Sequence, residues 1–151
     1  MRLTDRTDYA MRVLMVLGAS GKRHTVPSLA RAFHVSAHHL TKVVQALQAQ
    51  GWVETAPGRA GGVKLADAAQ WITVGDVVRA IEPDFELVDC FRTRGECPLA
   101  QPCALADLLK QARDAFLEQL DSVPLTNLFA AREQKLLSAV PMLVNGTGGS
   151  T

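Results

Sequence analysis

The chain has 151 residues, of which 21% are charged, and a formal net charge of +1. This length allows one domain, or one domain with a helical extension, and a modest buried core. We expect no secretory signal, because Asp5, Asp8 and Arg12 interrupt the apolar run that such a signal requires. No apolar run approaches membrane-spanning length. These features predict a cytoplasmic protein without a membrane partner, in which thiols stay reduced.

The charges are unevenly distributed along the chain. Residues 1–66 carry nine Lys/Arg and three Asp/Glu, whereas residues 67–151 carry seven and twelve. A basic N-terminal part is typical of a protein that binds a polyanion. Charge alone leaves open the alternative of an unevenly charged solvated surface.

Three helices are predicted in the first 51 residues. Thr4 is suited to cap the first helix, which ends at Gly18–Lys22. Thr25, followed by Val and Pro, starts a short second helix, and Ser36 caps a third helix that Gly51 ends. Apolar residues of the third helix repeat at the spacing of a buried face: Leu40, Val43, Val44 and Leu47.

The short turn between the second and third helices predicts a helix-turn-helix, whose second helix enters the DNA major groove. The candidate DNA-binding residues are polar and lie at the start and on the outer face of the third helix: Ser36, His38, His39, Thr41, Lys42 and Gln45. A merely solvated helix face is the alternative, and the helices alone do not decide between the two.

The next segment favours DNA binding. Residues 52–55 and 63–65 predict two short strands around A-P-G-R-A-G-G, whose glycines permit a hairpin turn. A hairpin directly after a recognition helix is a wing, and Arg59 at its tip suits a narrow minor groove. A phosphate-binding loop would instead require a helix starting at the glycines.

Two further helices are predicted downstream. Thr73 and Asp76 resemble a capping box for a helix that ends before Pro83, and Pro102 opens a long helix. The long helix carries an apolar stripe: Leu105, Leu108, Leu109, Ala112, Phe116 and Leu120. A monomer core could cover this stripe. We favour a two-fold dimer, which would also present two recognition helices to major grooves about 34–36 Å apart.

All three cysteines lie within C-F-R-T-R-G-E-C-P-L-A-Q-P-C, between Cys90 and Cys103. An odd number argues against disulfides, and clustering in a Gly/Pro-rich segment argues against unrelated buried thiols. Structural zinc usually takes short C-x2-C pairs with nearby histidines, and neither is present. Three thiolates with a ligand that is not Cys suit an iron-sulfur cluster better.

Four features together identify a resemblance: L-T-D-R-T-D-Y-A-M-R-V-L, H-L-T-K-V-V, G-R-A-G-G-V-K-L-A and the three cysteines. They resemble the dimeric winged-helix iron-sulfur regulators, the family that contains the nitric-oxide-sensing repressors of NsrR type and the cluster-biogenesis regulator IscR. The similarity runs from Met1 to about Leu128. The segment D-V-V-R-A-I-E-P-D-F-E-L-V-D-C-F is most similar to the NsrR type.

The resemblance implies that Cys90, Cys97 and Cys103 bind an iron-sulfur cluster, most simply 4Fe-4S, with 2Fe-2S as the alternative. It implies a fourth ligand in Asp8 from the partner subunit, since Ala106 stands where the biogenesis regulator has a His. The six residues between Cys90 and Cys97 exceed the interval usual in the family. Nitric oxide would release Asp8 from the partner's cysteine segment, so that the homodimer leaves double-stranded DNA with an inverted-repeat operator.

The predicted fold class is mainly α with a small two-stranded β wing, a winged helix-turn-helix domain followed by a long dimerisation helix. We expect a DNA-binding domain at 1–82, a cluster-binding segment at 83–103, a dimerisation helix and C-terminal helical segment at 104–140, and a disordered tail at 141–151. The same fold could sense iron or cluster status, oxygen or redox instead. A small electron-transfer protein would leave the helix-turn-helix unexplained. An enzyme is not expected, because no catalytic grouping can be placed.

Overall fold

The computed structural model describes residues 2–58, 61–88, 91 and 103–130. They form a mainly helical structure with a two-stranded antiparallel hairpin, as predicted. The elements in chain order are α1 (Asp5–Ser20), α2 (Val26–Phe33), α3 (Ala37–Ala49), β1 (Val53–Ala56), β2 (Gly62–Leu65), the 3-10 helix η1 (Asp67–Trp71), α4 (Val74–Ile81), α5 (Ala104–Asp121) and α6 (Thr126–Ala130). The 3-10 helix was not predicted.

Local hydrogen bonds start the first three helices where the sequence predicts. The hydroxyls of Thr4, Thr25 and Ser36 each accept a backbone N–H three residues later, which satisfies a donor that the helix leaves unpaired. Gly21 ends α1 in the left-handed conformation with φ 59°. These ends depend on contacts within a few residues, and for this reason sequence spacing is sufficient to predict them.

The hydrophobic core surrounds α1, which packs against α3, α4 and α6. The predicted apolar face of α3 is confirmed, because Leu40, Val43, Val44 and Leu47 are all buried. Helix α6 closes the core from the C-terminal side with Leu125, just before it, and Phe129. A Cβ on Gly18 would lie 2.6 Å from the Phe129 ring, so α1 needs a glycine at this crossing.

The hairpin pairs Val53 with Leu65 and Ala56 with Gly62. Strand β1 is shifted by one residue at both ends from its predicted range, and β2 starts one residue earlier than predicted. A third segment joins it, since the backbone of His24 exchanges hydrogen bonds of 2.8 and 2.7 Å with Val63. Gly62 has φ 131°, and a Cβ there would lie 2.5 Å from the carbonyl oxygen of His24. Close pairing with the α1–α2 connection therefore requires glycine at this position.

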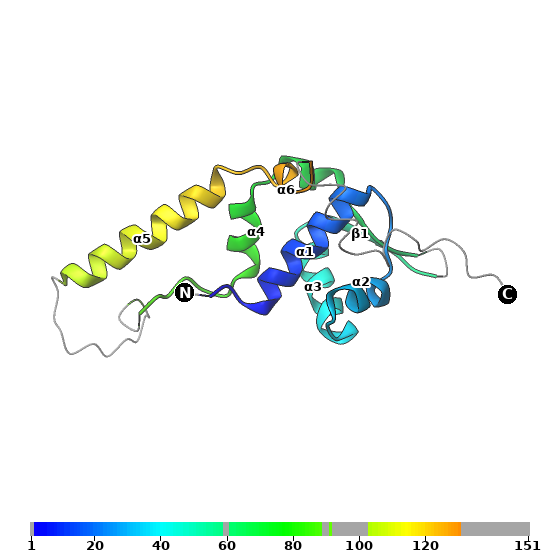
Figure 1. Ribbon diagram of the computed structural model, residues 1–151, viewed down its shortest axis with the longest axis horizontal. Coiled ribbons are helices and arrows are strands. Elements are labelled where there is room, and N and C mark those ends of the chain that lie inside the picture. The colour runs from blue at the N-terminus through cyan, green and yellow to red at the C-terminus, as the bar shows by residue number, and fades with distance from the viewer. Residues whose placement is uncertain (1, 59–60, 89–90, 92–102, 131–151) are drawn as a thin grey trace.

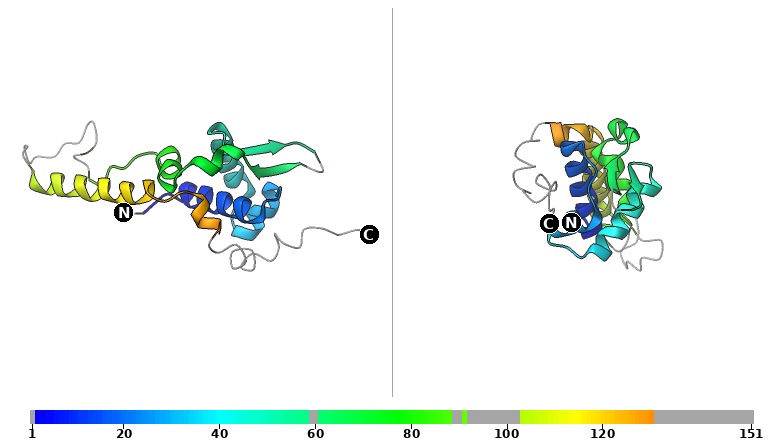
Figure 2. Two further views of the ribbon diagram at one scale, coloured as in Figure 1. Left: turned by 90° about the horizontal axis from the view of Figure 1, so that it is seen from above. Right: turned by 90° about the vertical axis from the view of Figure 1, so that its right-hand side faces the viewer.

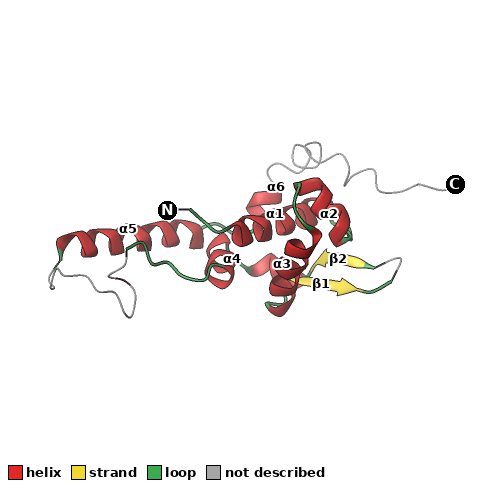
Figure 3. Cartoon of the chain, turned by 90° about the horizontal axis from the view of Figure 1, so that it is seen from below, coloured by secondary structure: helices red, strands yellow, loops and turns green. Residues whose placement is uncertain are grey.

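Helix α5 extends away from the body formed by α1 to α4, at the end opposite the hairpin (Figures 1 and 3). Its C-terminal half packs on α4, where Arg79 pairs with Asp121 at 2.6 Å and Leu117 is buried. Leu117 lies outside the predicted stripe. Among the described helices, none is both long and apolar enough to cross a membrane.

Candidate nucleic-acid interface and cysteine segment

The connection between α2 and α3 is a tight turn held by backbone hydrogen bonds. His34 is the one non-glycine residue with positive φ in the described part of the chain, at 56°. The N–H of Val35 donates to the carbonyl of Ala30 at 3.0 Å, and Ser36 then begins α3. This turn sets α3 against α2 as in a helix-turn-helix.

Helix α3 has one buried and one solvent-facing side. The predicted DNA-binding residues within the described chain are all exposed and lie together on the outer side: Ser36, His38, His39, Thr41, Lys42 and Gln45. The Thr41 hydroxyl donates to the carbonyl of Ala37 at 2.8 Å, so its oxygen remains available only as an acceptor. This surface offers hydrogen-bond donors, acceptors and a cation near a helix N-terminus, a combination suited to base edges and phosphates.

The hairpin lies beside α3 and projects from the body (Figures 2 and 3). Arg59, predicted at its tip, lies outside the described residues. Along the strands, Lys64 pairs with Glu54 at 2.9 Å, an exposed pair of small energetic value. Arg23 was missed by sequence reasoning, which had no local signal for it. Its guanidinium donates to the Gly62 carbonyl at 2.8 Å and ties the α1–α2 connection to the hairpin.

His24 anchors the same connection from the inside. The side chain is buried, with Nε2 lying 2.8 Å from the Ser20 hydroxyl. Burial, and secondarily the charge of Lys22, lowers the pKa of His24 below its ordinary value. The imidazole is therefore neutral near pH 7 and acts as an internal hydrogen-bonding group.

Of the three predicted cysteine ligands, Cys103 is described, whereas Cys90 and Cys97 lie outside the described residues. Cys103 is partly buried, carries a free thiol and occupies the N-cap position of α5. Within the described ranges no three His, Cys, Asp or Glu residues converge on a metal position. The fit to a cluster therefore rests on donor chemistry, since three thiols within one short segment match what iron-sulfur clusters bind.

Asp8, the predicted fourth ligand, lies in the first turn of α1. Its carboxylate pairs with Arg12 at 2.6 Å, and the side chain is 46% exposed. The start of α5, where Cys103 lies, is at the far end of the molecule from the α1–α3 body (Figure 1). A carboxylate at the surface is available to a second protomer.

Glu82 was not singled out from the sequence. It follows α4 and accepts three hydrogen bonds from the start of α1: from the Thr4 N–H at 2.8 Å, from the Thr4 hydroxyl at 2.6 Å and from the Thr7 hydroxyl. Burial alone would raise the pKa of Glu82, but the hydrogen bonds from Thr4 and Thr7 lower it overall. Nothing in the local sequence marks this contact, because 78 positions separate Thr4 from Glu82.

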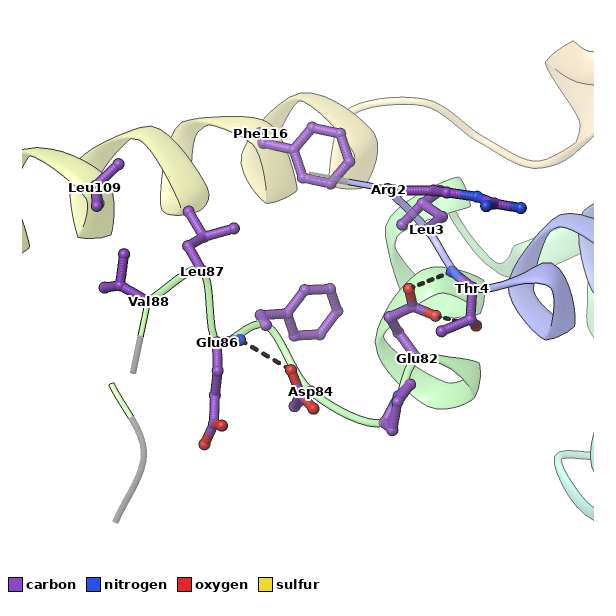
Figure 4. A pocket seen from close by; sticks show the side chains of 12 residues that line it. Arg2, Leu3, Thr4, Glu82, Asp84, Glu86, Leu87, Val88, Leu109 and Phe116 are labelled. Atoms are coloured by element: carbon purple, nitrogen blue, oxygen red, sulfur yellow. Dashed lines mark hydrogen bonds between the residues drawn. The ribbon is translucent and has the colours of Figure 1, made fainter. Parts of the chain in front are cut away.

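Thr4 and Glu82 border a cavity of about 470 Å³. The segment 83–88 forms another part of its lining, and Leu109 and Phe116 of α5 close the opposite side (Figure 4). The segment that leads to the cysteines therefore lies between the start of α1 and α5.

Comparison with known proteins places the chain in a family of transcriptional regulators and supports the fold described above. The model of the Rrf2 family, described as an iron-dependent transcriptional regulator, matches residues 3–131. The chain is 42% identical to the HTH-type transcriptional regulator NsrR of Geobacillus kaustophilus over 87% of this chain and 92% of that protein. It is 38% identical to NsrR of Bacillus subtilis, covering 88% and 93%. It is also 43% identical to Protein aau3 of Rhizobium meliloti, covering 89% and 88%.

Solved structures support the winged-helix fold class. The structure of CymR, the global cysteine regulator of B. subtilis, superposes with a TM-score of 0.68 at 24% identity, covering 87% of this chain and 98% of that one. T. potens IscR superposes with a TM-score of 0.69 at 19% identity, covering 89% and 90%. These structures confirm the fold, and the relatives named NsrR together with the family match confirm the predicted resemblance.

Proposed function

Since the chain belongs to the Rrf2 family of transcriptional regulators, we propose that it is a cytoplasmic, homodimeric repressor with an iron-sulfur cluster, which leaves its inverted-repeat operator when nitric oxide reacts with that cluster. The observation that carries DNA binding is the outer side of α3, where six polar residues are exposed beside a hairpin. The three clustered cysteines and the relatives named NsrR support the regulatory part.

Helix α3 would enter the major groove with its exposed side. His38, Lys42 and Gln45 then face base edges, and Ser36 at the N-cap lies near the phosphates. Arg59 would enter the adjacent minor groove from the hairpin. Each protomer thus contacts one half-site, and both half-sites are occupied when two α3 helices lie about one DNA turn apart.

Cys90, Cys97 and Cys103 would hold the cluster together with Asp8 from the partner subunit. We infer a 4Fe-4S cluster, with 2Fe-2S as the alternative. When bound, the cluster supplies iron with which nitric oxide reacts. For Asp8 to serve as a ligand, its carboxylate must give up the ion pair with Arg12. Both side chains of this pair are partly exposed to solvent. An oxygen ligand of this kind is held less firmly by iron than a thiolate.

Dimerisation would use the exposed stripe of α5. Leu105 and Leu108 are 60% and 61% exposed in the single chain. Ala112 continues the same side of the helix and is also exposed. A two-fold contact between two such stripes buries them and brings the start of each α5 to the other protomer.

The link from cysteine segment to DNA would pass through α1. Helix α1 carries Asp8 on its surface and packs against α3 in the core. The bond between Asp8 and the partner's cluster would fix α1 relative to the other protomer, and through α1 the spacing of the two α3 helices. Loss of this bond would allow other spacings, so that fewer dimers match both half-sites.

The proposal is tested by anaerobic reconstitution followed by iron and sulfide quantification. We expect an iron-sulfur absorbance that Cys97→Ala abolishes. The protein should also select a site from duplexes with randomised inverted repeats, with an affinity that falls with salt and with nitric oxide. Lys42→Ala should weaken this binding, whereas Lys110→Ala, which removes the same charge from α5, should not. A colourless protein after reconstitution would refute cluster binding.

A second candidate is regulation by iron or cluster status in the same fold, favoured by the description of the matched family as iron-dependent. The two candidates differ in the agent that releases DNA. If an iron chelator releases the operator and nitric oxide at equal exposure does not, the second candidate is correct.

A further inference from the structure

The start of α1 is capped in an unusual way. In a capping box the N-cap hydroxyl accepts the N–H of the third helical residue, whose own Glu side chain accepts the N-cap N–H. Thr4 accepts the N–H of Thr7 at 3.4 Å, which supplies the first half. Thr7 has no carboxylate, and Glu82 from the end of α4 accepts the Thr4 N–H instead. A remote residue thus completes the cap (Figure 4).

Glu82 is also the last residue before the segment that leads to the cysteines. Pro83 follows it directly, and residues 84–88 continue along the cavity beside α5. Because a proline restricts the residue before it to extended conformations, Glu82 leaves α4 in one direction, with ψ 133°. A displacement of the segment would therefore move the Glu82 backbone, and the three hydrogen bonds would pass this movement to Thr4 and Thr7.

The other end of this contact lies in the core and in the first turn of α1. Thr7 is fully buried in the core, and the Asp8 N–H donates to the carbonyl of Thr4 at 3.1 Å in the first turn of the helix. Asp8 is thus one residue from a group that Glu82 holds. Helix α1 continues without interruption to Ser20 and packs on α3. Because α1 has no break between Asp5 and Ser20, we expect a movement of its first turn to shift the whole helix.

We propose that Glu82 is the positioning residue that transmits the state of the cysteine segment to α1 and, through it, to the recognition helix α3. This inference rests on the proposed function, which supplies a cysteine segment with two states. It assigns to Glu82 a role that neither DNA contact nor cluster ligation requires.

The test compares wild-type protein with Glu82→Ala, Glu82→Gln and the control Glu118→Ala, which removes an exposed carboxylate from α5. Hydrogen exchange is first measured on the cluster-free full-length chain. Loss of the cap should speed exchange in residues 5–8 about fivefold in Glu82→Ala. Glu118→Ala should leave exchange there unchanged. Equal exchange in Glu82→Ala and wild type would overturn the inference without reference to any cluster.

The second measurement compares cluster-free with anaerobically reconstituted protein. In wild type, reconstitution should slow exchange in 83–88, in the first turns of α1 and in α3. In Glu82→Ala the change should be confined to 83–88, at unchanged iron and sulfide content. Glu82→Gln should behave as wild type, because its carbonyl accepts the Thr4 N–H and its amide donates to the threonine hydroxyls.

Two failures are distinguishable. If wild-type protein takes up no iron and sulfide, the proposed function fails and there is no signal for Glu82 to transmit. If wild-type and Glu82→Ala protein take up the cluster and respond equally throughout α1, the role of Glu82 alone is refuted.

Discussion

Helices α3 and α5 both carry apolar residues at helical spacing, yet only α3 buries all of them. Leu40, Val43, Val44 and Leu47 of α3 are at most 3% exposed, whereas Leu105 and Leu108 of α5 are 60% and 61% exposed. Helix α3 is enclosed by α1, α2 and β1, while the first half of α5 extends beyond the body (Figure 1). Periodicity thus predicts that a helix face is apolar, but the fold determines what covers it.

If the α5 stripe is the dimer contact, Leu108→Asp should have the largest effect, on dimer association. A two-fold interface contains Leu108 twice, and burying a leucine contributes about 1.5–3 kcal/mol. We expect the dimer dissociation constant to rise more than about hundredfold, measured by sedimentation equilibrium. Lys110→Ala changes the charge equally on the opposite side of α5 and should leave association unchanged. A wild-type monomer at all concentrations would contradict the prediction.

Leu47→Ala tests the buried apolar face of α3, in contrast to the exposed stripe of α5. Removing a fully buried leucine should cost about 2–5 kcal/mol of unfolding free energy, measured by urea denaturation. Leu108→Ala, compared at concentrations below self-association, should cost no more than about 0.5 kcal/mol, as for other exposed positions. Equal losses would mean that α5 is covered within the monomer.

Gly75→Ala tests the joint between the body and α5. A Cβ at this position would lie 1.9 Å from Asp121 Oδ1 and 2.8 Å from the Asp121 backbone nitrogen. Separating α4 from α5 should cost about 1–3 kcal/mol and weaken the ion pair between Arg79 and Asp121. Asp121→Ala in the same background removes the side-chain clash but retains the backbone one. It should therefore restore only part of the stability in thermal unfolding.

The smallest effect is expected within the body, at His24. Its pKa is lowered in the folded chain by burial, so the unfolded chain binds the proton more readily. The folded state should have full stability above about pH 6.5, the unfolded value, and lose stability as the pH falls below it. His24→Gln should flatten this dependence in urea titrations. His38→Gln, at an exposed position on α3, should retain the wild-type slope, and an equal flattening would contradict the assignment.

The starts of α1 and α4 separate what sequence predicts from what it does not. Thr73 and Asp76 form a complete capping box within four residues, with the Thr73 N–H donating to Asp76 at 2.7 Å, and their spacing predicted it. The cap of α1 was only half predictable. Thr4 was expected, but Glu82 was not, because no spacing rule relates residues so far apart in the chain.

In the candidate site, too, features set by near neighbours were predictable and contacts between distant segments were not. The exposed side of α3 could be predicted, since a buried face at Leu40, Val43 and Leu47 fixes which side faces solvent. The pairing of His24 with Val63 and the contact of Arg23 with Gly62 could not. Neither leaves a local pattern, because each uses backbone groups that every residue carries.

The sequence by itself determined the starts of α1 to α4, the apolar faces, the hairpin and the three clustered thiols, since each depends on residues close together in the chain. The start of α5 was predicted at Pro102, whereas the helix begins at Ala104. Tertiary structure alone decided that Glu82 completes the cap of α1, that the α1–α2 connection holds the hairpin, and that α5 leaves its stripe uncovered. The physical reason is the distance along the sequence between the residues that interact. Hydrogen bonds and side-chain periodicity act between near neighbours, whereas these three outcomes require distant segments to be brought together by the fold.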